Sequence, residues 1–201
     1  MSCVSRNLAL AVTIAAQIFC AALATPAKYQ QPKNPRRANE LALAGIHPGS
    51  DKINAVEKRI PKTLSRDPLD PSAAHVWIEP CSNRKLSLDD DDSGTIQSVT
   101  IESSKPLPAS GCTTGGKHTA PVTSQFWKTG HGLALGDTKQ RVIEIYGKPG
   151  SAGPSVKNGR ELELLYYAFD WAGPDVPQVM EISCDRATGR VVEIMLAFPS
   201  L

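Results

Sequence analysis

Aromatic residues and chemical motifs are scarce in this chain of 201 residues, in which tryptophan, tyrosine and phenylalanine together make up 5%. Acidic and basic residues nearly balance, with a formal net charge of +2, so no electrostatic footprint for a nucleic acid is present. The sequence has no Cys-x-x-Cys, no Gly-x-Ser-x-Gly elbow and no Gly-Lys-Ser/Thr phosphate loop. We therefore expect no metal site, no cofactor, no catalytic residues and no nucleic acid partner.

Long apolar runs are absent after residue 24. Arg6 precedes the uncharged run at 8–24, and Ala22-Leu23-Ala24 fits the rule for signal cleavage. A run of about 17 residues also sits at the lower limit for an uncleaved membrane anchor. We expect a cleaved signal peptide at 1–24, which removes one basic and no acidic residue and takes the net charge from +2 to +1. The mature protein is then exported, periplasmic or extracellular, without stable membrane insertion.

Cysteine is also rare, and three cysteines follow the predicted signal: Cys81, Cys112 and Cys184. Export places them in an oxidising compartment, and the odd number leaves one thiol over. Cys81 and Cys112 flank the first predicted hairpin, so we predict a disulfide between these two. Cys184 lies inside a predicted strand, where a buried free thiol is expected.

The chief positive feature is that the second half of the chain repeats the first. Residues 45–51 and 132–138 share a Gly–apolar–x–x–Gly pattern that leads into a short helical stretch with a helix cap. Each half then ends in a predicted hairpin, with Gly94 in the first turn and Gly189 in the second. We expect the halves to superpose, with Gly49 equivalent to Gly136.

This repeat predicts an α+β fold of two tandem small modules, each a short helix or helix pair on an antiparallel β-sheet. A proline-rich stretch at 25–38 is predicted to be a flexible linker. The first module covers 39–103 and the second 122–201. The glycine- and proline-rich segment at 104–121 is the predicted linker between them.

Residues 127–198 carry the repeated pattern most fully, including the segment Tyr146-Gly147-Lys148-Pro149 after the second helix. The pattern resembles the SmpA/OmlA and β-lactamase-inhibitor-protein-like (BLIP-like) families of small exported bacterial modules. The first module departs from it, with Arg59-Ile60-Pro61 at the same place. The resemblance implies binding or scaffolding, for instance in outer-membrane assembly or in inhibition of an enzyme. No small residue precedes Cys20, which disfavours lipidation and with it the assembly role.

Most aromatic residues fall in the second module, and one predicted strand carries two apolar faces. Tyr167, Phe169 and Trp171 alternate with the opposite face of Leu162, Leu164 and Tyr166. If the even-numbered face is core, the aromatic row either packs against the first module or forms a partner surface. We take Tyr167, Phe169 and Trp171 as the candidate partner surface.

We therefore predict an exported, non-enzymatic binding or scaffolding protein that engages a protein partner in the cell envelope. The alternative is a small secreted hydrolase that uses His and Asp side chains in a groove between modules. Its histidines would come from a scattered set: His47, His75, His118 and His131. The acidic run at 89–92 predicts a solvated hairpin turn. Calcium binding is the alternative, but it is disfavoured because adjacent carboxylates on a strand end point in alternate directions and do not converge on one ion.

Overall fold

The computed structural model describes six stretches of the chain, namely residues 39–66, 75–79, 82, 84–103, 126–169 and 178–198. All of them belong to one compact unit, residues 35–201. Among these residues, no helix has the length and apolar character needed to cross a bilayer.

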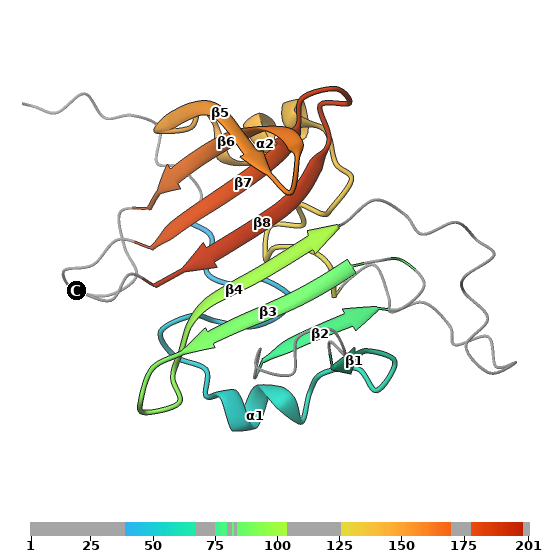
Figure 1. The fold of residues 1–201 in the computed structure, drawn as a ribbon. Helices are drawn as coiled ribbons and strands as arrows, with labels where there is room; N and C mark the ends of the chain where they lie inside the picture. The colour runs from blue at the N-terminus through green and yellow to red at the C-terminus, as the bar shows by residue number, and fades with distance from the viewer. Residues whose placement is uncertain are drawn as a thin grey trace, which may run out of the picture. The chain divides into compact units, whose positions relative to one another are not determined.

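The described residues build one antiparallel sheet of eight strands, seen from one face in Figure 1. Its spatial order is β1-β2-β3-β4-β8-β7-β6-β5. The strands are β1 (Ser65–Arg66), β2 (Val76–Glu79), β3 (Arg84–Asp90), β4 (Ile96–Ser103), β5 (Ser151–Lys157), β6 (Arg160–Ala168), β7 (Val179–Asp185) and β8 (Val191–Ala197). The two helices are α1 (Ile53–Glu57) and α2 (Lys139–Tyr146).

The predicted α+β fold of two tandem modules is wrong, because the fold is mostly β and its halves share one sheet. Strand β4 pairs directly with β8, placing Val99 opposite Leu196 and Ile101 opposite Ile194. The buried apolar residues of both halves also form a single core cluster. The physical reason is that a four-stranded half with one short helix leaves an unpaired edge strand and a poorly covered apolar face. Pairing β4 of the first half with β8 of the second half removes the unpaired edge of each half.

The two halves nevertheless make matching contacts at the turns that the sequence singled out. The amide of Gly49 donates to the carbonyl of Ile96 at 2.7 Å, and the amide of Gly136 donates to the carbonyl of Val191 at 2.8 Å. Both glycines have positive φ, +77° and +92°, a conformation that glycine adopts without steric cost. A common origin of the halves stays a prediction.

The contact between the two loops that precede the helices is also reciprocal. The amide of Ala44 donates to the carbonyl of Lys128 at 3.0 Å, and the amide of Gly130 donates to the carbonyl of Ala42 at 2.9 Å. In Figure 1 these loop segments, coloured blue and yellow, run behind the sheet. They therefore lie on the covered side and join the halves a second time.

Helix α2 begins and ends where the sequence signals predict. The side chain of Thr138 accepts a hydrogen bond from the amide of Arg141 at 3.2 Å, and Gly147 follows the last turn with φ +73°. Val142 and Tyr146, one turn apart, are buried. Helix α1 begins at Ile53 without a side-chain cap, and the carboxylate of Asp51 instead accepts a hydrogen bond from the amide of His47.

Strand β5 lies at the edge of the sheet, although its sequence contains residues that are typical of turns. Gly153 and Pro154 are unfavourable in a central strand, but β5 is an edge strand, where both are tolerated. Asn158 and Gly159, both with positive φ, form the tight turn into β6. This hairpin brings Lys157 and Arg160 to the site described below.

The start of the described chain is fastened to the second half by the buried carboxylate of Glu40, which is 1% exposed. It accepts hydrogen bonds from the amides of Gly130 and His131 at 3.0 and 3.1 Å. It also accepts one from the Tyr146 hydroxyl at 2.6 Å. Burial alone would raise the pKa of Glu40, but these bonds, with others from Ala42 and the His131 ring, hold it below its usual value. We call this group the Glu40 clamp.

Gly130 is expected to be intolerant of even a methyl group, because a Cβ there would lie 2.6 Å from Oε1 of Glu40. The Gly130→Ala variant should lower the free energy of unfolding by about 1–3 kcal/mol, as overpacking does. Gly153→Ala is the matched control, since a Cβ at Gly153 meets nothing within 4 Å. Urea denaturation of the two variants measures the difference, and equal stabilities would show that the Glu40 clamp adjusts freely.

Candidate binding site

The sheet has one covered face and one that we call the open face, and the strand register assigns every side chain to one of them. Leu86, Val99, Ile194 and Ile182 are among the buried residues of the covered face. The central row of the open face runs across six strands, through residues paired in register. These residues, all half-buried, are Val76, Ser87, Thr100, Met195, Glu181 and Tyr166.

The candidate partner surface on β6 is corrected by this register. Tyr167 and Phe169 are 0% and 1% exposed and lie in the core, where their rings stack with centroids 6.4 Å apart. They therefore offer no surface to a partner, and Trp171 lies outside the described residues. Tyr166, predicted to be core, is the aromatic residue of β6 on the open face. Because both faces of β6 are apolar in sequence, the alternation alone did not decide which one faces inward.

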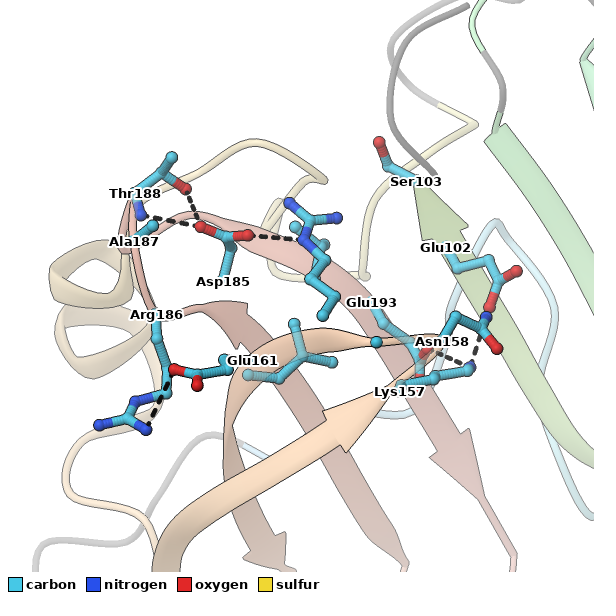
Figure 2. Close-up of a pocket in the computed structure, with 14 residues that line it drawn as sticks. Glu102, Ser103, Lys157, Asn158, Glu161, Asp185, Arg186, Ala187, Thr188 and Glu193 are labelled. Atoms are coloured by element: carbon cyan, nitrogen blue, oxygen red, sulfur yellow. Dashed lines mark hydrogen bonds and ion pairs between the residues drawn. The ribbon is translucent and has the colours of Figure 1, made fainter.

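A pocket of about 910 Å³ lies at one end of the open face, between the β5–β6 turn and the β7–β8 turn. Leu162 and Val192 give it apolar walls, and charged side chains surround them. Figure 2 shows two separate groups of charged residues: Glu161 with Arg186 on one side, and Lys157 with Glu102 and Glu193 on the other. A further labelled pair, Asp185 with Thr188, lies above Glu161 in this view.

Lys157 neutralises two carboxylates that the sheet forces together. Glu102 on β4 and Glu193 on β8 are directly opposite in register, and like charges so placed destabilise a sheet. The ammonium of Lys157 lies 3.0 Å from Glu102 Oε2 and also pairs with Glu193. Lys85 binds the other oxygen of Glu102 at 2.7 Å. Burial alone would lower the pKa of Lys157, but its hydrogen bonds to Glu193 and Glu102 raise it. The lysine therefore holds the β5–β6 turn over the open face.

Asp185 fixes an arginine inside the pocket. Its Oδ2 accepts from Arg160 Nε at 2.5 Å, and its Oδ1 accepts from the amide and hydroxyl of Thr188 at 2.8 and 2.9 Å. The hydrogen bond from Arg160, followed by those from Thr188, lowers the pKa of Asp185 to about 2. Asp185 is therefore ionised at any physiological pH, and it holds the guanidinium of Arg160 through the Nε–H group.

The described histidines lie in three separate acid–histidine contacts, which does not favour the hydrolase alternative. His47 lies 3.6 Å from Asp51, His75 lies 3.2 Å from Glu57, and His131 lies 3.0 Å from Glu40. The hydroxyl beside the last of these belongs to Tyr146, whose pKa is raised by burial and by Glu40, so it stays protonated. A protonated phenol is a poor nucleophile. His118 lies outside the described residues.

The acidic run at 89–92 ends strand β3 with its first two residues and enters the hairpin turn with its last two, close to one of the two interpretations. Asp91 accepts hydrogen bonds from the amides of Ser93 and Thr95, each at 2.9 Å, and from the Gln97 side chain at 2.8 Å. Within the described part of the chain, no three His, Cys, Asp or Glu residues are grouped so as to hold a metal ion. The carboxylate of Asp91 thus serves the turn itself.

Cys184 is buried and unbonded, as its place in a predicted strand indicated. Burial, with a smaller contribution from the charge of Glu163, raises the pKa of its thiol to about 11. The thiol is therefore neutral and unreactive in the folded protein. Cys81 and Cys112 lie outside the described residues, so their disulfide stays a prediction.

No protein family model, no curated protein and no solved structure matches this chain. Sequence reasoning missed the pocket, because its charged residues come from five strands, β4 to β8. The one local signal was the Asn158-Gly159 pair, a strong hairpin marker that places Lys157 and Arg160 side by side.

Proposed function

We propose that this protein is an exported, non-enzymatic binding protein that engages a protein partner in the cell envelope through the open face of its sheet. The observation that carries the proposal is the central row of that face. Thr100 and Met195 lie at its middle, and Tyr166 lies two strands away. In Figure 1 no described helix crosses this side of the sheet. A wide strand face of mixed apolar and polar side chains is suited to a protein partner.

The charges of the central row favour a partner with a basic side chain. Glu181 is opposite Met195 on β8 and opposite Tyr166 on β6. No described residue forms an ion pair with Glu181, whereas Glu102 and Glu193 are both neutralised by lysine. A partner that presents a lysine or arginine to Glu181 and apolar groups to Met195 and Tyr166 would satisfy all three residues.

Export is part of the same proposal and is supported by the apolar run at 8–24 and by Ala22-Leu23-Ala24. The resemblance of residues 127–198 to the SmpA/OmlA and BLIP-like families supports the same proposal. Members of these families bind or scaffold other proteins, which agrees with a role that needs no catalytic residue.

Site-specific crosslinking in cells of the source organism tests the proposal. A photoreactive amino acid at Thr100, in the middle of the open face, should form an adduct with one exported protein. The same amino acid at Glu144, on the exposed side of α2, is the matched control and should form none. Adducts at position 144 but not at position 100 would place the partner on the helical side and contradict the proposal.

The affinity of the captured partner provides the quantitative test. Tyr166→Ala should weaken binding by about 2 kcal/mol, as expected for an aromatic anchor. Glu181→Gln should also weaken it and reduce its dependence on salt, while Glu144→Gln should change neither. Calorimetry at two salt concentrations measures both effects. Unchanged affinity in Tyr166→Ala and Glu181→Gln would show that the partner does not use the central row.

A further inference from the structure

We infer that the pocket beside Arg160 is a binding site for an organic carboxylate whose apolar part lies against Leu162 and Val192. The pocket residues are contributed by strands from both halves of the sheet together with two turns. The inference is independent of the proposed protein partner, because it concerns a ligand small enough to enter a cavity of about 910 Å³.

Among the charged groups of the pocket, the ones that still lack a partner among the described residues are hydrogen-bond donors. Each carboxylate there already has a cationic partner: Glu161 pairs with Arg186 at 3.5 Å, and Asp185 pairs with Arg160 at 2.5 Å. Lysine neutralises the other two, as described above. Arg160, by contrast, uses only Nε, and no described residue accepts a hydrogen bond from its two Nη atoms. An unsatisfied guanidinium edge is suited to a planar anion that accepts two parallel hydrogen bonds.

Arg160 is also held in place before any ligand arrives. Asp185 accepts a hydrogen bond from Nε of Arg160. Thr188 in turn donates to Asp185, as the dashed lines between these two residues in Figure 2 show. The Arg160 side chain is 27% exposed, so it is partly withdrawn from water. A positioned, partly desolvated arginine loses little side-chain freedom on binding, which favours affinity.

The surroundings favour a carboxylate over a phosphate. Four carboxylates line the pocket, and a dianion would be repelled by them more strongly than a monoanion. Leu162 and Val192 line the pocket and give it an apolar wall that inorganic phosphate does not use. A branched aliphatic acid satisfies both the guanidinium edge and the apolar wall. The same group could be a free acid or the carboxyl terminus of a peptide.

Titration followed by NMR tests the inference on the folded protein, with isovalerate as the probe. We expect saturable shifts of the Leu162 and Val192 methyl signals, with a dissociation constant in the millimolar range. Isovaleramide has the same shape without the charge and should cause no saturable shift. Shifts of equal size with isovaleramide, tighter binding of phosphate, or no shift with isovalerate would each overturn the inference. The peptide Gly-Gly-Leu with a free or an amidated carboxyl terminus distinguishes the two sources.

Two arginine variants separate position from charge. Arg160→Gln should weaken isovalerate binding by about tenfold or more, the size expected for a lost charge-assisted pair. Arg186→Gln removes the same charge at the rim and should change binding less than about twofold. Equal losses in both would mean that net charge alone attracts the anion. If Arg160→Gln is misfolded, Val192→Thr serves instead and should reduce the preference for isovalerate over acetate, whereas an unchanged preference would contradict the apolar wall.

Discussion

Replacing Glu40 with alanine is expected to lower the free energy of unfolding by about 3–5 kcal/mol, the range for removing one partner of a buried charged network. The variant leaves the amides of Gly130 and His131 and the Tyr146 hydroxyl without their acceptor. Buried donors that lose their acceptor carry a desolvation cost that no other bond offsets. Urea denaturation measures the effect.

Glu144→Ala is the control for this experiment, because Glu144 is exposed on α2 and should change stability by less than about 0.5 kcal/mol. The acid dependence gives a second measurement. The pKa of Glu40 is lowered in the folded state, so its stabilisation is present above the unfolded value, about 4.5, and is lost as the pH falls through the folded value. Glu40→Ala should therefore lose less stability on acidification than the parent protein. A parallel loss in both would show that the Glu40 clamp carries no linked proton.

Ile194→Ala is the second large effect that we expect, a loss of about 2–5 kcal/mol from a cavity at the junction of β4 and β8. Ile194 is 0% exposed and lies opposite Ile101 on β4 and Ile182 on β7. Because both halves share this core, hydrogen exchange should show the same loss of protection in β3 and in β7. Loss confined to β6, β7 and β8, with β3 unchanged, would mean that the halves unfold as separate modules.

Local features of the fold were predictable from the sequence. The turn glycines Gly94 and Gly189, the cap of α2 at Thr138 and the hairpin after β3 follow from short-range rules that depend on a few neighbouring residues. The pairing of β4 with β8 is not local. Residues 98–102 and 193–197 carry no signal that distinguishes pairing with each other from ending as two free edges.

The candidate site was less predictable than the fold, for a related reason. Whether Tyr166 or Tyr167 faces the core depends on which side of the shared sheet is covered, and α2 and the loops behind the sheet decide that. Arg160 and Asp185 are 25 positions apart and meet only because β6 pairs with β7. Ion pairs between residues so far apart in sequence cannot be predicted from hydrophobic periodicity or from residue spacing.

The junction of β4 with β8 also has a consequence for how the chain folds. Ile101 and Ile194 are 93 positions apart in sequence, so their contact closes a long loop and raises the contact order of the protein. Until β8 has been placed, β4 remains an unpaired edge that another chain could extend. The apolar residues of β4 alternate with polar residues that face the open side, namely Ser98, Thr100 and Glu102. Polar or charged residues at such positions discourage pairing with a strand of another chain. The polar residues of β4 thus protect this strand against aggregation until β8 pairs with it.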